Sequence, residues 1–80
     1  MAKLPILSSK DVIRVLNYLS FEPAPKRGKG SHSAFMKKTG ERTYLVIVPD
    51  RGEIPKGTLL SIIEQMGLTK IEFIKILRKL

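Results

Sequence analysis

The chain has 80 residues, 42% of them hydrophobic and 28% charged. Chains split into separate cores only at several times this length, so we expect one domain spanning residues 1–80. The composition allows a buried core beneath an ordinary charged surface. Cysteine is absent, which excludes a disulfide framework, a thiolate zinc site and a cysteine nucleophile, and suits a reducing cytoplasm.

The charge balance is strongly basic, with 15 Lys and Arg against 7 Asp and Glu and a net charge of +8. Such an excess favours polyanionic partners, nucleic acid first among them, although charge alone is also compatible with a merely solubilising surface. The cations are concentrated in the middle of the chain, where only Glu41 opposes them. They are Lys26, Arg27, Lys29, Lys37, Lys38 and Arg42.

The start of the chain predicts a helix rather than a membrane anchor or signal peptide. Its opening, MAKLPILSSKDVIRVL, is broken early by Pro5 and polar residues, so neither export nor membrane spanning is expected. Ser8 or Ser9 can cap a helix from about Lys10 to Ser20, and Asp11 completes a capping box with Ser8. The apolar stripe of this helix consists of Val12, Ile13, Leu16 and Leu19.

Three extended segments follow the first helix. Phe21–Arg27 predicts a weak edge strand, because its two prolines cannot donate hydrogen bonds to a neighbouring strand. After a glycine-containing turn, Ser31–Lys37 can extend until Thr39-Gly40 starts the return of a hairpin. Thr43–Val48 reads TYLVIV, which is β-branched, aromatic and nearly all apolar, and therefore predicts a strand that Pro49 ends.

The last third of the chain predicts two helices. Leu59, Ile62, Ile63 and Met66 recur at helical spacing until Gly67, after a loop rich in Pro and Gly from Pro49 to Gly57. Thr69 and Glu72 form a second capping box, which opens a final helix. The residues of this helix available for burial are Ile71, Phe73, Ile74, Leu77 and Leu80.

The order of these elements, helix, three strands, helix and helix, predicts an α+β fold. We expect a three-stranded antiparallel sheet with helices on one face and the other face open. An open sheet face beside a basic hairpin would suit RNA.

His32 is the only histidine. Histidine is the side chain whose unperturbed pKa lies close enough to neutrality for easy proton exchange in the cytoplasm. In a strand, alternate side chains point to opposite faces, so His32 and Phe35 lie on different faces, and burial of Phe35 would turn His32 outward. The cations just upstream can contact phosphates, and Gly28 and Gly30 let backbone amides approach them closely. His32 is therefore the candidate for catalysis, against the alternative of a simple surface residue.

Other site chemistries find little support in the sequence. One histidine without cysteine does not predict zinc, and Asp50 with Glu53 is too small a set for a magnesium site, so we expect no metal or cofactor. Gly28–Ser31 lacks the spacing of a nucleotide-binding phosphate loop and leads into a strand. Ser31 and Ser33 have no acidic partner beside His32 that would make either a nucleophile. Tyr44 can stack on a base or be half-buried structure.

The segment Arg27-Gly28-Lys29-Gly30-Ser31-His32, followed by Phe35, resembles the Gly-Ser-His signature of HicA toxins, which are also called YcfA-like proteins. The strand end Val46–Pro49, the segment Ile54–Leu59 and the segment Ile62–Thr69 resemble further landmarks of that family in the same order. The resemblance thus covers nearly the whole chain. Two features depart from the common pattern, namely Asp50 where histidine is frequent and the two prolines of the first strand.

This resemblance implies a fold like that of a double-stranded-RNA-binding domain, ribonuclease activity on messenger RNA, and neutralisation by a HicB-type antitoxin. It also implies that His32 is catalytic. The hypothesis is that the ribose 2′-OH attacks the adjacent phosphate with His32 as general base or acid, and that water, a lysine or a backbone-positioned group carries the second proton. The expected RNA-binding residues are Lys26, Arg27, Lys29, Gly30, Ser31, Lys37, Lys38 and Arg42.

Two other classes of function stay open at this point. A non-catalytic RNA-binding module would use the same basic hairpin and sheet without cleavage. A DNA-binding protein could use the helices around Gly67-Leu68 as a helix-turn-helix unit. The final helix, however, commits most of its apolar residues to burial and leaves mainly charged residues suited to phosphate contact, so this class ranks below RNA binding.

Overall fold

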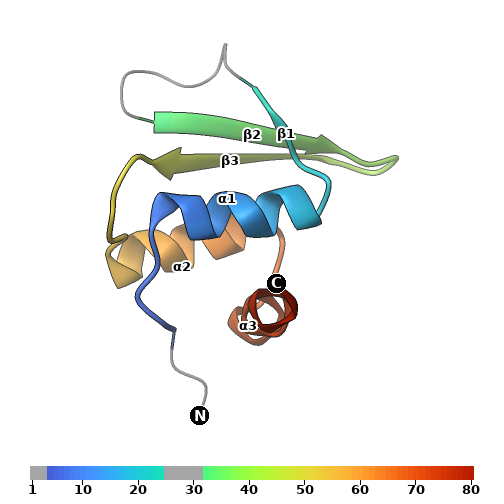
Figure 1. Cartoon of the computed structure of the whole chain (residues 1–80). Coiled ribbons are helices and arrows are strands. Elements are labelled where there is room, and N and C mark those ends of the chain that lie inside the picture. The colour runs from blue at the N-terminus through green and yellow to red at the C-terminus, as the bar shows by residue number, and fades with distance from the viewer. Residues whose placement is uncertain (1–3, 25–31) are drawn as a thin grey trace.

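The computed structural model describes residues 4–24 and 32–80, and shows a sheet and two layers of helices (Figure 1). Residues 1–3 and 25–31 lie outside the described part. The predicted first-strand residues Pro25, Lys26 and Arg27 and the turn that follows them fall in that segment. The elements are α1 (Ser9–Tyr18), β1 (Glu22–Pro23), β2 (His32–Lys38), β3 (Thr43–Pro49), α2 (Lys56–Gln65) and α3 (Lys70–Lys79).

The three strands form one antiparallel sheet in the order β1-β2-β3. In its centre Phe35 of β2 lies opposite Val46 of β3, and Pro23 of β1 lies opposite Phe35 on the other side. The strand predicted around the two prolines is therefore an edge strand, as expected, but within the described residues it is only two residues long. Proline lacks the N–H that a longer ladder would need.

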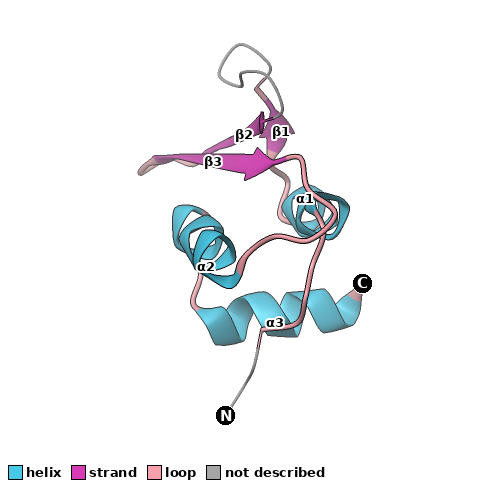
Figure 2. Ribbon diagram, turned by 90° about the vertical axis from the view of Figure 1, so that its left-hand side faces the viewer, coloured by secondary structure: helices cyan, strands magenta, loops and turns pink. Residues whose placement is uncertain are grey.

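The core lies between the sheet and the helices. Phe35, Val46 and Val48 point from the sheet toward α1 and α2, which cover the same face (Figure 1). Figure 2 shows α3 crossing beneath these two helices, on the side away from the sheet. This arrangement confirms the predicted α+β fold with a three-stranded antiparallel sheet and helices on one face. The residues of the helices that are fully or nearly fully buried are Val12, Val15, Leu16, Leu59, Ile62, Ile63 and Phe73.

The first helix begins with the predicted capping box. The backbone N–H of Ser8 donates to the Asp11 carboxylate at 2.9 Å, and the N–H of Asp11 donates to the Ser8 hydroxyl at 3.4 Å. The helix ends two residues before the predicted end, because Ser20 has a φ of 67°, in the left-handed region. The N–H groups of Ser20 and Phe21 then close the last turn on the carbonyls of Asn17 and Leu16.

The second helix begins earlier than predicted and ends at the predicted glycine. Its first turn already contains Lys56 and Gly57, and Pro55 is the N-cap. The first N–H groups of a helix have no partner within it, so a helix can begin directly after a proline. At the other end Gly67 has a φ of 77°, and the N–H groups of Gly67 and Leu68 donate to Glu64 and Ile63. This is the Schellman arrangement that glycine favours.

We expect Gly67→Ala to destabilise the fold by about 1–2 kcal/mol or more, because a left-handed backbone strains a residue with a Cβ. A Cβ built on Gly67 would also lie 2.5 Å from Cε2 of Tyr44, so the tyrosine ring must move. The measurement is the free energy of unfolding from a urea titration. Gly57→Ala is the matched control, since a Cβ there meets no atom within 4 Å, and an equal loss in both variants would contradict the argument.

The last helix has the predicted capping box but buries fewer residues than predicted. Phe73 and Ile74 are buried and Leu77 is partly buried, whereas Ile71 and Leu80 are 58% and 41% exposed. The prediction that these two residues are buried was therefore wrong. Ile71 lies roughly 200° around the helix axis from Phe73, since successive residues turn by about 100°. Leu80 follows the last helical residue.

The capping box of α3 gives an acid-dependent contribution to stability. The backbone N–H of Thr69 donates to Glu72 at 2.8 Å, and this bond, with the hydroxyl of Thr69, lowers the pKa of Glu72 below its ordinary value. A carboxylate with a lowered folded pKa stabilises the fold above its unfolded pKa, and the contribution is lost as pH falls through the folded pKa. We expect Glu72→Gln to lower the melting temperature at pH 7 and to differ less from wild type at pH 3. A constant difference across that range would contradict this.

Candidate active site

His32 is the first residue of β2 and its side chain is exposed. It pairs with Pro49, the last residue of β3, so both lie at the same end of the sheet. Phe35 is 6% exposed and faces the helices. Because alternate residues of a strand face opposite sides, His32 is on the face away from the helices, which we call the open face. The structure thus agrees with the predicted orientation of His32.

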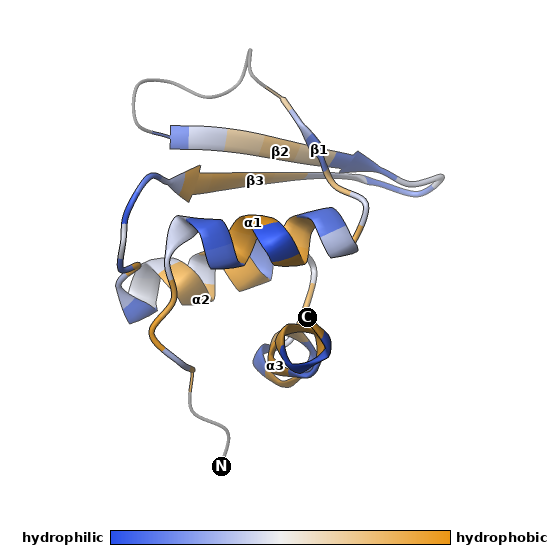
Figure 3. Cartoon of the chain, viewed as in Figure 1, coloured by the Kyte–Doolittle hydropathy of each residue, from blue (hydrophilic) through white to orange (hydrophobic). Residues whose placement is uncertain are grey.

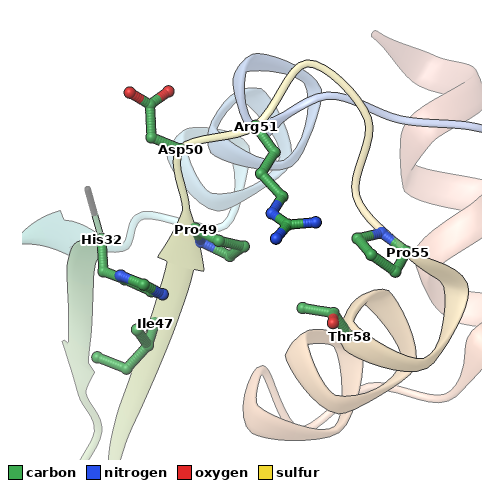
Figure 4. A pocket seen from close by; sticks show the side chains of 7 residues that line it. All are labelled: His32, Ile47, Pro49, Asp50, Arg51, Pro55 and Thr58. Atoms are coloured by element: carbon green, nitrogen blue, oxygen red, sulfur yellow. The ribbon is translucent and has the colours of Figure 1, made fainter.

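An open pocket of about 440 Å³ lies beside His32 (Figure 4). It extends from the open face around the end of β3 to the first turn of α2, and its size lies in the range of roughly 300–1,000 Å³ that is usual for small-ligand sites. In Figure 4 the imidazole of His32 and the guanidinium of Arg51 extend into the same hollow, and the carboxylate of Asp50 points away from it. The lining residues are His32, Ile47, Pro49, Asp50, Arg51, Pro55 and Thr58.

Hydrogen bonds to residues far away in the sequence fix the loop between β3 and α2, which forms one side of this pocket. The N–H of Ser9, at the start of α1, donates to the carbonyl of Arg51 at 2.9 Å. The N–H of Ile54 donates to the carbonyl of Leu7 at 2.8 Å, and the side chain of Ile54 is 3% exposed. The loop between β3 and α2 is therefore held at both ends against the segment that leads into α1.

The structure does not bring all of the predicted RNA-binding residues to His32. Lys26, Arg27, Lys29, Gly30 and Ser31 lie outside the described residues. Lys37 and Lys38 end β2, and Arg42 follows in the hairpin turn, so these three lie at the opposite end of the sheet. At about 3.3 Å per residue, the six steps from His32 to Lys38 span roughly 20 Å. Figure 3 shows polar ends of β2 on either side of an apolar middle.

Two cations at the hairpin end contact aromatic rings. The ammonium of Lys37 lies 5.9 Å from the ring centre of Phe21, and the guanidinium of Arg42 lies 4.5 Å from that of Tyr44. Tyr44 is half-buried and meets the edge of Phe21 with ring centres 6.5 Å apart. These contacts favour the structural interpretation of Tyr44 over base stacking.

Arg51 and Thr58 are pocket residues that the sequence interpretation missed. Both fall in the stretch around the Pro- and Gly-rich loop, which predicted only a connection. A signal for Arg51 was available in the strand pairing. The end of one hairpin strand must lie beside the start of the other, so the residues just after Pro49 come close to His32.

Within residues 4–24 and 32–80, no group of three or more His, Cys, Asp or Glu side chains is arranged to hold a metal ion. No helix in the same part of the chain is long and apolar enough to cross a bilayer.

A protein-family model described as HicA toxin of bacterial toxin-antitoxin matches residues 9–68, three quarters of the chain. The matched segment contains α1, the whole sheet, the loop with Arg51 and α2, and it ends just before α3. A comparison with curated proteins finds no match.

Proposed function

This chain belongs to the HicA toxin family of bacterial toxin–antitoxin systems, and from that premise we propose that it is an endoribonuclease that cleaves messenger RNA without a metal ion. Its antitoxin partner is then of the HicB type, and its place of action is the cytoplasm. The observation that carries the proposal is the exposed imidazole of His32 beside an open pocket. A general acid or base must reach the proton that it transfers, and an exposed side chain can do so.

The proposed reaction needs no nucleophile from the protein. The 2′-oxygen of one ribose forms a bond to the adjacent phosphorus, and the bond from phosphorus to the 5′-oxygen of the next nucleotide breaks. One proton leaves the 2′-hydroxyl and one proton reaches the departing 5′-oxygen. His32 carries one of these two transfers and water or another group of the site carries the other. The products are a 2′,3′-cyclic phosphate and a 5′-hydroxyl.

RNA binding is proposed to follow the sheet from the His32 end to the hairpin end. Lys38 lies on the same face as His32, by the alternation of the strand. Lys37 alternates to the opposite face, where its ammonium lies over Phe21, and the Arg42 guanidinium lies over Tyr44, so these two are proposed to contact RNA from the hairpin tip and not from the open face. Lys26, Arg27, Lys29, Gly30 and Ser31 directly precede His32 in the sequence and are proposed to contact phosphates near the cleaved bond. Cations at both ends of an RNA strand would fix its register relative to His32.

The test is incubation of the purified protein with a labelled messenger RNA in EDTA, followed by mass spectrometry of the product ends. We expect cleavage with 2′,3′-cyclic phosphate and 5′-hydroxyl ends. Cleavage only after addition of a divalent cation would contradict the metal-independent mechanism. Salt-sensitive binding without any cleavage would replace the nuclease with a non-catalytic RNA-binding module.

A further inference from the structure

Arg51 faces the same pocket as His32 from the loop between β3 and α2 (Figure 4). We propose that Arg51 is a second catalytic residue, which binds the non-bridging oxygens of the scissile phosphate while His32 transfers a proton. This inference rests on the proposed function. The sequence predicts phosphate contacts from residues 26–31 and from the hairpin. The inference places a phosphate contact in the described part of the pocket instead.

The position of Arg51 is suited to a fixed ligand contact. Its own carbonyl accepts a hydrogen bond from Ser9 at 2.9 Å, and three residues later Ile54 is buried and bonded to Leu7. The backbone that carries the guanidinium is thus held on both sides, whereas the side chain itself is exposed. Because the backbone is already fixed before the substrate arrives, only the side chain of Arg51 has to lose conformational freedom on binding.

The other described residues of the pocket leave the cationic role to Arg51. Besides His32, the lining residues are two prolines, an isoleucine, a threonine, an aspartate and Arg51. Figure 4 shows the guanidinium pointing toward Thr58 and the Asp50 carboxylate pointing away from the hollow. Lys38 stands roughly 20 Å along β2 from His32, too far to contact the same phosphate.

The chemistry of arginine fits the step that His32 cannot perform. A phosphodiester carries one negative charge, and attack by the 2′-oxygen adds a second as the pentavalent transition state forms. A guanidinium donates two parallel hydrogen bonds to phosphate oxygens and stays charged throughout, so its attraction grows in the transition state. It does not exchange protons at neutral pH. Arg51 would therefore stabilise charge, and proton transfer would remain with His32.

The first experiment compares single-turnover cleavage rates of wild type, Arg51→Gln, Arg51→Lys and Arg78→Gln. We expect Arg51→Gln to slow cleavage by about 10²-fold, as loss of one transition-state donor typically does. Arg51→Lys should recover part of the rate, because lysine keeps the charge but not the paired donors. Arg78 is an exposed arginine in α3, in the layer farthest from the sheet, and its variant controls for net charge. Equal rates in Arg51→Gln and Arg78→Gln would overturn the proposal.

The second experiment does not depend on cleavage. His32 is the only histidine, so the ring Hε1 proton of its imidazole gives an NMR signal that no other histidine overlaps and that reports on the pocket. We expect uridine 3′-monophosphate to shift this signal in wild type, and Arg51→Gln to weaken the binding about tenfold while Arg78→Gln leaves it unchanged. If phosphate binding depends on Arg51 but the protein cleaves no RNA, the proposed phosphate site stands and the proposed nuclease activity is refuted. Cleavage that does not depend on Arg51, with no shift of the His32 signal, would refute the phosphate site alone.

Discussion

Replacing His32 by alanine is expected to lower the rate of RNA cleavage by about 10²–10⁴-fold, the contribution that one positioned proton-transfer group typically makes. The imidazole is exposed at the start of β2, so its removal leaves no cavity in the core. The fold and most of the affinity for RNA should therefore survive. The measurements are the single-turnover rate on messenger RNA and the binding of a 2′-O-methyl RNA that cannot be cleaved.

Ser33→Ala provides the matched control for this variant. Ser33 follows His32 on the same strand and is also exposed, but strand alternation turns it to the other face of the sheet. We expect its cleavage rate to stay within about twofold of wild type. The sequence offers no acidic partner for His32 that would let it activate this serine as a nucleophile, so the hydroxyl has no expected role in cleavage. A His32→Ala protein that cleaves as fast as wild type would show that another group performs the chemistry.

Local signals in the sequence were sufficient to predict most of the fold. The capping boxes at Ser8 and Thr69 and the glycine at position 67 act over three to five residues, and each is found where it was predicted. The helix end at Ser20 could not be predicted in the same way. A serine rarely adopts the left-handed conformation, so its residue type gave no sign of the turn.

The position of the candidate site could be predicted in part. The hairpin is symmetric about residues 39–42, where the N–H of Thr39 donates to the carbonyl of Arg42 at 2.9 Å. Counting outward from this turn pairs His32 with Pro49, so the neighbourhood of Asp50 and Arg51 follows from register. The placement of the Arg51 backbone does not follow, because it depends on contacts with Ser9 and Leu7 more than 40 positions away in the sequence.

The basic segment shows why proximity in sequence does not give proximity in space. Lys37 and Lys38 are only five and six residues from His32, and the sequence interpretation grouped them into one binding cluster. A strand is the most extended conformation of a chain, so those few residues span the length of the sheet. An arginine 19 positions from His32 instead shares its pocket, because the hairpin folds back.

The last helix, which lies beyond the segment matched by the family model, is expected to be essential for stability. Phe73 is fully buried where α3 crosses beneath α1 and α2 (Figure 2). Phe73→Ala should cost about 3–5 kcal/mol in the free energy of unfolding, from lost burial and the cavity left behind. A chain of 80 residues has a total stability on the order of 4–12 kcal/mol. The variant should therefore lose about a quarter of that stability or more, and unfold at a clearly lower urea concentration than wild type.

Ile71 lies on the same helix two residues earlier and is 58% exposed, so Ile71→Ala separates burial from the mere loss of an apolar side chain. We expect it to change the free energy of unfolding by no more than about 0.5 kcal/mol, as is usual for an exposed position. Urea unfolding followed by circular dichroism measures both variants. Equal and small losses would mean that α3 adds little to the fold, and that the sheet with α1 and α2 holds the pocket of His32 and Arg51 in place without it.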